Sequence, residues 1–273
     1  MSLLDAAGIY VLVDLPEINR DAPTWNLEVY ASYTSAIDSM QNYTNVLGFF
    51  AGNEVINSVN TSNSAAFVKA VVRDMKSYIQ AQGYRSMGIG YATNDDITIL
   101  SNSEDYFNCG DSASSIDFLG LNIYSWCGNS SYTESGYSEL TDSLSNYSLP
   151  VFFSEYGCVT VGGAAGRTFT EVQALYSSQM TGVFSGGIVY EYFEESNDYG
   201  KTVILPLSTV TANSFPKRSR DSFWQFRLNS GGLQRLVHAN GFGVPVIHCI
   251  ECLHSYQYSC SVMSYHGFYM AGI

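Results

Sequence analysis

The chain has 273 residues, enough for one large α/β domain or two smaller ones, and its 46% hydrophobic content is ordinary for a globular protein. Its formal net charge of −13, from 25 acidic and 12 basic residues, argues against nucleic-acid binding, which needs a basic face for phosphate contacts. No apolar run reaches about 18 residues, so the sequence predicts no transmembrane helix.

Apolar runs and helical spacings alternate along the first half of the chain. Residues 9–15 form a β-branched run that is typical of a buried parallel strand, and residues 29–43 have helical spacing. Residues 46–51 predict a second strand. We expect Asn60 or Ser62 to cap the helix that follows. A short, glycine-rich third strand is predicted after that helix, at 87–91.

The same alternation continues to residue 192. We predict strands at 116–124, 151–154 and 187–192, and a helix at 168–181. Strands alternating with helices in units of roughly 30–45 residues predict βαβ units and a parallel sheet. The preferred fold class is an α/β (β/α)8 TIM-type barrel that is N-terminally truncated, with its first strands missing. A doubly wound sheet ranks second, because no Gly-x-Gly-x-x-Gly motif follows any strand.

Charge divides the chain near residue 200. Residues 1–200 carry 6 basic and 23 acidic residues, a net −17, whereas residues 201–273 carry 6 and 2, a net +4, and all four histidines. We therefore expect a partial catalytic barrel over 1–200 and an atypical tail over 201–273. We interpret the tail as disordered or as translated from an intron or a shifted frame. Its His248-Cys249-Ile-Glu-Cys252-Leu-His254 segment fits no zinc-finger spacing, so no metal is predicted.

Two glutamates follow predicted strands at the end where barrel enzymes place their active sites. Glu54 comes after the second strand and Glu155 after the fifth. Two carboxyls across a cleft suit glycoside chemistry, in which one protonates the leaving oxygen and the other attacks the anomeric carbon. Asn53 is suited to bind a sugar hydroxyl, and Tyr124 is suited to hold the nucleophile. Each residue alone also fits a solvated loop or a packed barrel rim.

The acidic body has the composition of a secreted protein. Three of its residues are cysteines, and four N-glycosylation sequons begin at Asn42, Asn60, Asn129 and Asn146. With few lysines, these features indicate an oxidising, secretory context. Because the first residues have no signal-peptide pattern, we expect that the N-terminus is missing from this chain. The 21 tyrosines and 15 phenylalanines fit a sugar-binding cleft, or the surface of a secreted protein.

Five blocks follow one another along the chain: Val46-Leu-Gly-Phe-Phe-Ala-Gly-Asn-Glu-Val55, Phe67-Val-Lys-Ala70 with Arg73-Asp-Met-Lys76, Tyr124-Ser-Trp-Cys-Gly128, Phe152-Phe-Ser-Glu-Tyr-Gly-Cys158 and Ser185-Gly-Gly-Ile-Val-Tyr190. In order and approximate spacing, they resemble the fungal 1,3-β-glucanosyltransferases of glycoside hydrolase family 72, the glycolipid-anchored surface proteins. The resemblance covers about residues 3–200. It implies a retaining enzyme that cuts β-1,3-glucan and passes the retained chain from a glycosyl-enzyme to a second glucan chain.

The resemblance also assigns roles to single residues. By match, Glu54 is the general acid/base, Glu155 is the nucleophile, and Asn53 and Tyr124 support them. Residues that line the sugar subsites are matched by Asp14, Tyr190 and Tyr199. The implied partners are β-1,3-glucan donor and acceptor chains, with no metal or organic cofactor. The family implies the cell wall and a GPI-anchored place at the plasma membrane, although this chain shows neither a signal nor an anchor sequence.

The resemblance further implies a disulfide between Cys127 and Cys158 that ties two active-site loops, contributing on the order of 3 kcal/mol. Cys109 either matches a family cysteine whose partner lies downstream or is a free thiol. Two alternative functions remain. An endo-β-1,3-glucanase would share both glutamates and differ in acceptor handling, whereas a catalytically inactive glucan-binding fragment would need neither glutamate.

Overall fold

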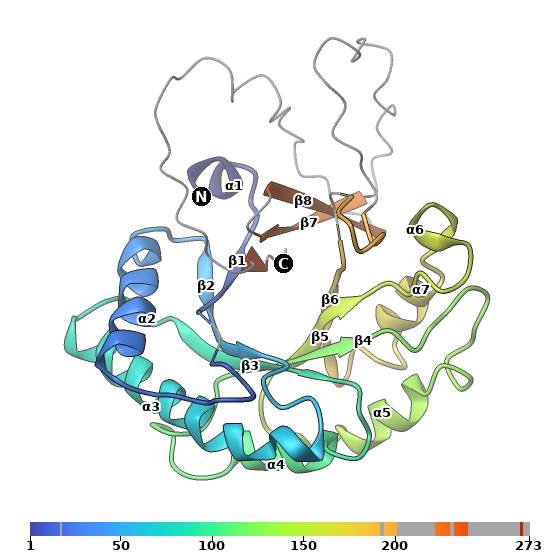
Figure 1. Ribbon diagram of the computed structural model, residues 1–273. Coiled ribbons are helices and arrows are strands. Elements are labelled where there is room, and N and C mark those ends of the chain that lie inside the picture. The colour runs from blue at the N-terminus through green and yellow to red at the C-terminus, as the bar shows by residue number, and fades with distance from the viewer. Residues whose placement is uncertain (17, 192–193, 201–221, 230–231, 240–267, 270–273) are drawn as a thin grey trace.

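The computed structural model describes residues 1–200 except 17 and 192–193, together with the backbone of 222–229, 232–239 and 268–269. Six parallel strands curve into a half-barrel with helices on its outer side (Figure 1). The strands are β1 Val11–Asp14, β2 Val46–Asn53, β3 Gly88–Asn94, β4 Leu119–Ile123, β5 Val151–Tyr156 and β6 Phe184–Val189. The helices are α1 Ser2–Ala6, α2 Leu27–Met40, η1 Val59–Ser64, α3 Ala65–Ala81, α4 Leu100–Asn108, α5 Tyr137–Ser143, α6 Gly163–Gly166 and α7 Glu171–Leu175.

Strand order separates the two folds that the sequence left open. From β6 to β1 the strands lie side by side in chain order, and each pair is parallel. A doubly wound sheet reverses its order at a switch point, where its ligand binds. No reversal occurs between β1 and β6, so the doubly wound alternative is wrong and the sheet is wound in one direction.

The two long helices form for reasons that are visible in the sequence. The Asn26 side chain accepts hydrogen bonds from the first backbone amides of α2, at 3.0 Å each. The predicted apolar stripe of α3 is buried against the sheet. Its predicted cap is wrong, because residues 59–64 form a separate 3-10 turn. That turn is closed by a capping box between Ser58 and Thr61, so α3 begins only at Ala65.

Aromatic side chains fill the space that the glycines of β3 leave open. A Cβ added at Gly90 would stand 2.2 Å from the ring of Phe118, so only glycine fits there. The Phe118 ring in turn packs edge-on against Phe50, with centroids 5.2 Å apart, and lies 6.0 Å from Phe152. This packing explains why so short and glycine-rich a segment is a buried central strand.

Two helices differ from the prediction. The helix expected over 168–181 is much shorter, α7 at Glu171–Leu175. Beyond it, the Ser177 hydroxyl donates to the Ala174 carbonyl and accepts from the Gln179 amide, which favours a turn over further helix. Helix α4 was not predicted, because its buried side chains include the polar residues Ser103 and Glu104, which hide the apolar periodicity.

The tail contributes backbone strands to the same sheet. They are β7 Ser222–Asn229, β8 Gly232–Ala239 and β9 Phe268–Tyr269, and β9 pairs antiparallel with β1. The cysteines and histidines considered for zinc between residues 248 and 260 lie outside the described residues. The non-native origin of the tail stays a prediction. Within the described part of the chain, no helix combines the length and apolar character needed to cross a membrane.

Candidate active site

Polar side chains converge where the parallel strands end. Glu54 directly follows β2, Glu155 is the penultimate residue of β5, and Tyr124 follows β4. In the sheet register, Asn122 of β4 stands beside Glu155 of β5. Asp14 is the buried last residue of β1 and lies at the same edge. The structure therefore brings these residues to the carboxyl edge of the sheet, where parallel α/β folds bind ligands.

Glu54 is half-buried, and its environment favours the protonated form. Burial is the main cause that raises the pKa of its carboxyl. A hydrogen bond from Asn122 acts in the opposite direction, and the negative charge of Glu155 raises the pKa further. The backbone of Glu54 has φ of 50°, a left-handed conformation that non-glycine residues seldom adopt. Strain of this kind is concentrated at functional sites, where the surroundings hold it in place.

Asn122 connects the two halves of the site and was not singled out from the sequence. Its Nδ2 donates to Oε1 of Glu54 at 2.8 Å and to Oδ1 of Asn53 at 3.0 Å. Its Oδ1 accepts from the hydroxyl of Ser154, beside Glu155, at 2.8 Å. The side chain is buried, with 1% of its surface exposed. One signal was present, namely an amide side chain inside an otherwise apolar strand.

A tyrosine holds the second glutamate. The hydroxyl of Tyr124 donates to Oε2 of Glu155 at 2.5 Å, and Glu155 is 7% exposed. Tyr124 also meets two other rings edge-on, with centroids 6.3 Å from Tyr190 and 5.5 Å from Tyr199. The rings of Tyr190 and Tyr199 lie 5.2 Å apart. All three tyrosines keep part of their surface exposed, so together they form an aromatic wall beside Glu155.

The loops after β4 and β5 are fastened to each other. The predicted disulfide between Cys127 and Cys158 is confirmed, with Cα atoms 5.1 Å apart. Beside it, the Trp126 indole donates to the hydroxyl of Thr170 at 2.9 Å, and that hydroxyl donates to the Gly128 carbonyl at 3.3 Å. Closing a 31-residue loop stabilises the fold by on the order of 3 kcal/mol.

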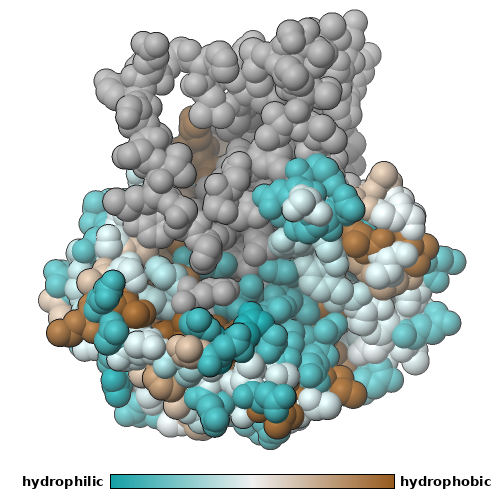
Figure 2. All heavy atoms as spheres, in the orientation of Figure 1, coloured by the Kyte–Doolittle hydropathy of each residue, from teal (hydrophilic) through white to brown (hydrophobic). Residues whose placement is uncertain are grey.

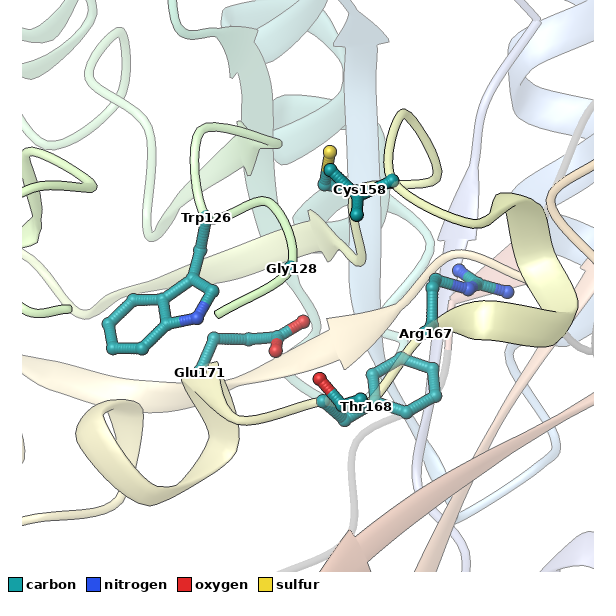
Figure 3. A pocket seen from close by; sticks show the side chains of 8 residues that line it. Trp126, Gly128, Cys158, Arg167, Thr168 and Glu171 are labelled. Atoms are coloured by element: carbon teal, nitrogen blue, oxygen red, sulfur yellow. The ribbon is translucent and has the colours of Figure 1, made fainter. Parts of the chain in front are cut away.

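A small hollow under these loops shows how tightly they pack. Its volume is about 10 Å³, close to the space of one water molecule, and Trp126, Arg167 and Glu171 are among its lining residues (Figure 3). In the view of Figure 2, hydrophilic residues cover most of the described surface, and hydrophobic residues gather in separate patches. No group of three or more His, Cys, Asp or Glu side chains suited to a metal occurs in the described ranges.

Other predicted residues lie at the surface of the described part of the chain. The sequon asparagines are all exposed, as glycan attachment requires; they are Asn42, Asn60, Asn129 and Asn146. Cys109 is an exposed free thiol among the described residues, with the Lys69 ammonium 3.1 Å from its sulfur.

Comparison with known proteins identifies the family of this chain. A protein-family model described as glucanosyltransferase, of glycoside hydrolase family 72, matches residues 1–221, which extends past residue 200, where we expected the resemblance to end. A 1,3-β-glucanosyltransferase of Arthroderma benhamiae is 57% identical over 204 residues, and the 1,3-β-glucanosyltransferase gas1 of Schizosaccharomyces pombe is 47% identical over 220 residues. These alignments cover 73% and 79% of this chain, but only 37% and 40% of the relatives.

A solved structure matches the same part of the chain. It is that of Saccharomyces cerevisiae Gas2p in complex with laminaritetraose and laminaripentaose. The TM-score is 0.70 at 47% sequence identity, and the match covers 73% of this chain and 45% of the yeast chain. The described half-barrel is therefore similar to less than half of that longer protein.

Proposed function

Since this chain belongs to glycoside hydrolase family 72, the glucanosyltransferases, we propose that it cleaves β-1,3-glucan chains and re-joins them by a retaining double displacement. One observation carries the proposal. Glu54 and Glu155 have different environments at one sheet edge, and the Asn122 amide bonds Glu54 directly. Two carboxyls with distinct environments are what acid and nucleophile roles require.

In the first step, Glu54 acts as the acid. Burial raises the pKa of its carboxyl, which favours the protonated form that the leaving glycosidic oxygen needs. A Glu155 oxygen, oriented by the hydroxyl of Tyr124, attacks the anomeric carbon. The bond from that carbon to the leaving oxygen breaks, the oxygen takes the proton of Glu54, and the retained glucan is held as an ester of Glu155.

In the second step, the roles reverse. Glu54, now ionised, removes the proton from a hydroxyl of the acceptor glucan, and this oxygen attacks the anomeric carbon. The ester bond breaks and Glu155 leaves as a carboxylate, so one β-1,3 linkage is lost and one is formed. Asp14, Asn53, Tyr190 and Tyr199 line the sugar subsites in this proposal. Water in place of the acceptor would give hydrolysis.

The proposal extends to fold and location. The six parallel strands are the larger part of a (β/α)8 barrel, as supported by the match to a longer solved structure. The missing first strands stay a prediction. A place at the cell surface is supported by the Cys127–Cys158 disulfide and by the exposed sequon asparagines. The GPI anchor stays a prediction.

Product length tests the proposed function. We would incubate the purified protein with a β-1,3-gluco-oligosaccharide labelled at its reduced end and read product lengths by mass spectrometry. Glu155→Ala is the inactive variant, and Glu139→Gln, at an exposed carboxylate on α5, is the matched control. Products longer than the substrate, lost only in Glu155→Ala, are the expected result.

The other outcomes separate the alternatives. Shorter products alone would identify an endo-β-1,3-glucanase, because the glycosyl-enzyme then reacts only with water. Binding without any product, unchanged by Glu155→Ala, would identify an inactive glucan-binding fragment and overturn the proposed chemistry.

A further inference from the structure

Arg167 lies buried between the loops of the site, with 9% of its surface exposed. Its Nη1 donates to the Gly157 carbonyl at 3.1 Å and to the Tyr190 carbonyl, and its Nη2 donates to the Tyr199 carbonyl. These carbonyls belong to the loop after β5, the residue directly after β6 and the segment beyond it. One guanidinium thus fastens three stretches of chain that are separate in sequence.

The chemistry of this contact is specific to arginine. A guanidinium carries five donors in a planar fork, whereas the lysine ammonium is a single point charge, so lysine does not reproduce three directed bonds. With 9% of its surface exposed, Arg167 holds its charge partly out of water, and this burial lowers its pKa. Hydrogen bonds from a charged donor are stronger than neutral ones, and they offset that cost.

The backbone around Arg167 is shaped for this contact. Gly157 has φ of 119°, and a Cβ added there would stand 2.9 Å from Nη1 of Arg167 and 3.3 Å from the Tyr190 oxygen. A side chain at this position would therefore press against the guanidinium and the Tyr190 carbonyl. Two non-glycine residues with left-handed backbone, Phe169 and Asp198, flank the same contact in the described chain.

The three carbonyls connect Arg167 to the aromatic wall. Fixing the carbonyls of Tyr190 and Tyr199 fixes the two rings that pack against Tyr124. The Tyr124 hydroxyl in turn holds Glu155. We therefore expect a change at Arg167 to move the rings of Tyr190 and Tyr199.

We propose that Arg167 is a positioning residue that sets the aromatic wall of Tyr190 and Tyr199 and thereby decides whether the Glu155-bound glucan reacts with an acceptor sugar or with water. The inference rests on the proposed function, in which these tyrosines line the saccharide cleft. Acceptor transfer depends on a sugar held in place beside the ester, so it is more sensitive to ring position than hydrolysis by small, abundant water is.

A second arginine supplies the matched control. Arg85 is also partly buried, and its Nη2 donates to the carbonyls of Tyr43, at 2.7 Å, and Val46. Those carbonyls lie at the start of β2, the opposite end of the strand from Glu54. Arg85→Lys removes the same kind of contact away from the cleft, so it reports what the loss of a buried guanidinium does to the fold alone.

The experiment compares Arg167→Lys and Arg167→Ala with Arg85→Lys and the parent protein. It measures the ratio of transfer to hydrolysis products, the KM for a β-1,3-gluco-oligosaccharide, and the Kd of the same sugar by calorimetry. We expect the two Arg167 variants to lose roughly tenfold in transfer ratio and to bind the sugar roughly tenfold more weakly. Arg85→Lys should keep both values and lower only the melting temperature.

Each other outcome is decisive. An unchanged ratio and Kd in the Arg167 variants, or equal changes in Arg85→Lys, would overturn the inference. So would failure of both Arg167 variants to fold, because the guanidinium would then hold the fold as a whole rather than the two rings. If the parent protein makes no transfer products, the proposed function fails, and the Kd values alone then test whether Arg167 sets the sugar-binding wall.

Discussion

The buried asparagines at the two ends of the parallel strands have different kinds of hydrogen-bond partner. At the amino ends, long or amide side chains satisfy backbone carbonyls: Arg85 bonds those of Tyr43 and Val46, and Asn45 bonds that of Ile9 at 3.0 Å. At the carboxyl ends, Asn122 instead bonds the side chains of Asn53 and Glu54. At the amino ends, the polar side chains thus satisfy backbone groups, whereas at the carboxyl ends Asn122 orients a carboxylate.

This contrast indicates which property a substitution will affect. A side chain that satisfies buried backbone contributes to the free energy of unfolding, because its loss leaves a carbonyl unpaired. A side chain that orients a carboxylate contributes mainly to the stabilisation of the transition state. We therefore expect variants at the amino ends to change stability and variants at the carboxyl ends to change turnover. The following tests can contradict that division.

The largest effect is expected for Glu155→Gln. The amide keeps the shape and the contact with the Tyr124 hydroxyl, but it cannot form the ester, so turnover should fall by about 10⁴-fold. Stability should not fall, because a charge near Glu54 is removed. Oligosaccharide turnover and thermal unfolding check this. A lower melting temperature would mean that Glu155 also stabilises the fold.

Asn122→Ala should lower kcat/KM by about 100-fold and shift its pH dependence. The Asn122 hydrogen bond lowers the pKa of Glu54, so its loss raises that pKa further. Because Glu54 must be protonated in the first step, activity falls as pH rises through this pKa. The alkaline limb of the kcat/KM profile should therefore move to higher pH. Asn45→Ala, at an equally buried amide of the amino ends, is the control and should leave the limb in place.

Lys76→Met tests whether a contact at the amino ends affects stability alone. The Lys76 ammonium donates to the carbonyls of Ser112 and Ser115, at 3.0 and 2.6 Å, and to Asp117 at 2.7 Å. Its loss should cost about 2 kcal/mol and lower the melting temperature by about 6 °C, with product lengths unchanged. A changed product distribution would contradict the division between the two ends.

The smallest effect concerns Glu104, which lies at neither end. Burial, and secondarily the charge of Asp105, raise its pKa from 4.5 to about 7. Because the folded value is the higher one, stability is full below about pH 4.5 and is lost as pH rises toward 7. Glu104→Gln should therefore gain about 1 kcal/mol above pH 7 and nothing below pH 4.5, with kcat unchanged. Denaturant unfolding at both pH values measures this difference.

Much of the fold was readable from local pattern. Buried parallel strands are continuous apolar runs, so all six were found, and the strand ends located Glu54, Glu155 and Tyr124. The five ordered blocks pointed to the family. Element boundaries were less secure, because η1 and α7 depend on hydroxyl-to-backbone bonds that compete with regular helix.

The parts that were missed depend on contacts between distant segments. Asn122 has no local pattern around it, because its partner Glu54 is 68 residues away. Arg167 falls at the edge of a predicted helix, and nothing near it in sequence indicates that its fork reaches Tyr199, 32 residues on. Both residues act through partners that only the folded sheet brings close.

The order of the strands also bears on how the chain is built during synthesis. Because β1 to β6 lie side by side in chain order, each strand emerging from the ribosome finds its neighbour already present. We expect this order to let the sheet grow strand by strand from β1, with each new strand closing only the loop of its own crossover. Until the next strand arrives, the growing sheet has an unpaired edge strand. Such an edge can pair with another chain, which promotes aggregation, and it is a surface that chaperones can cover.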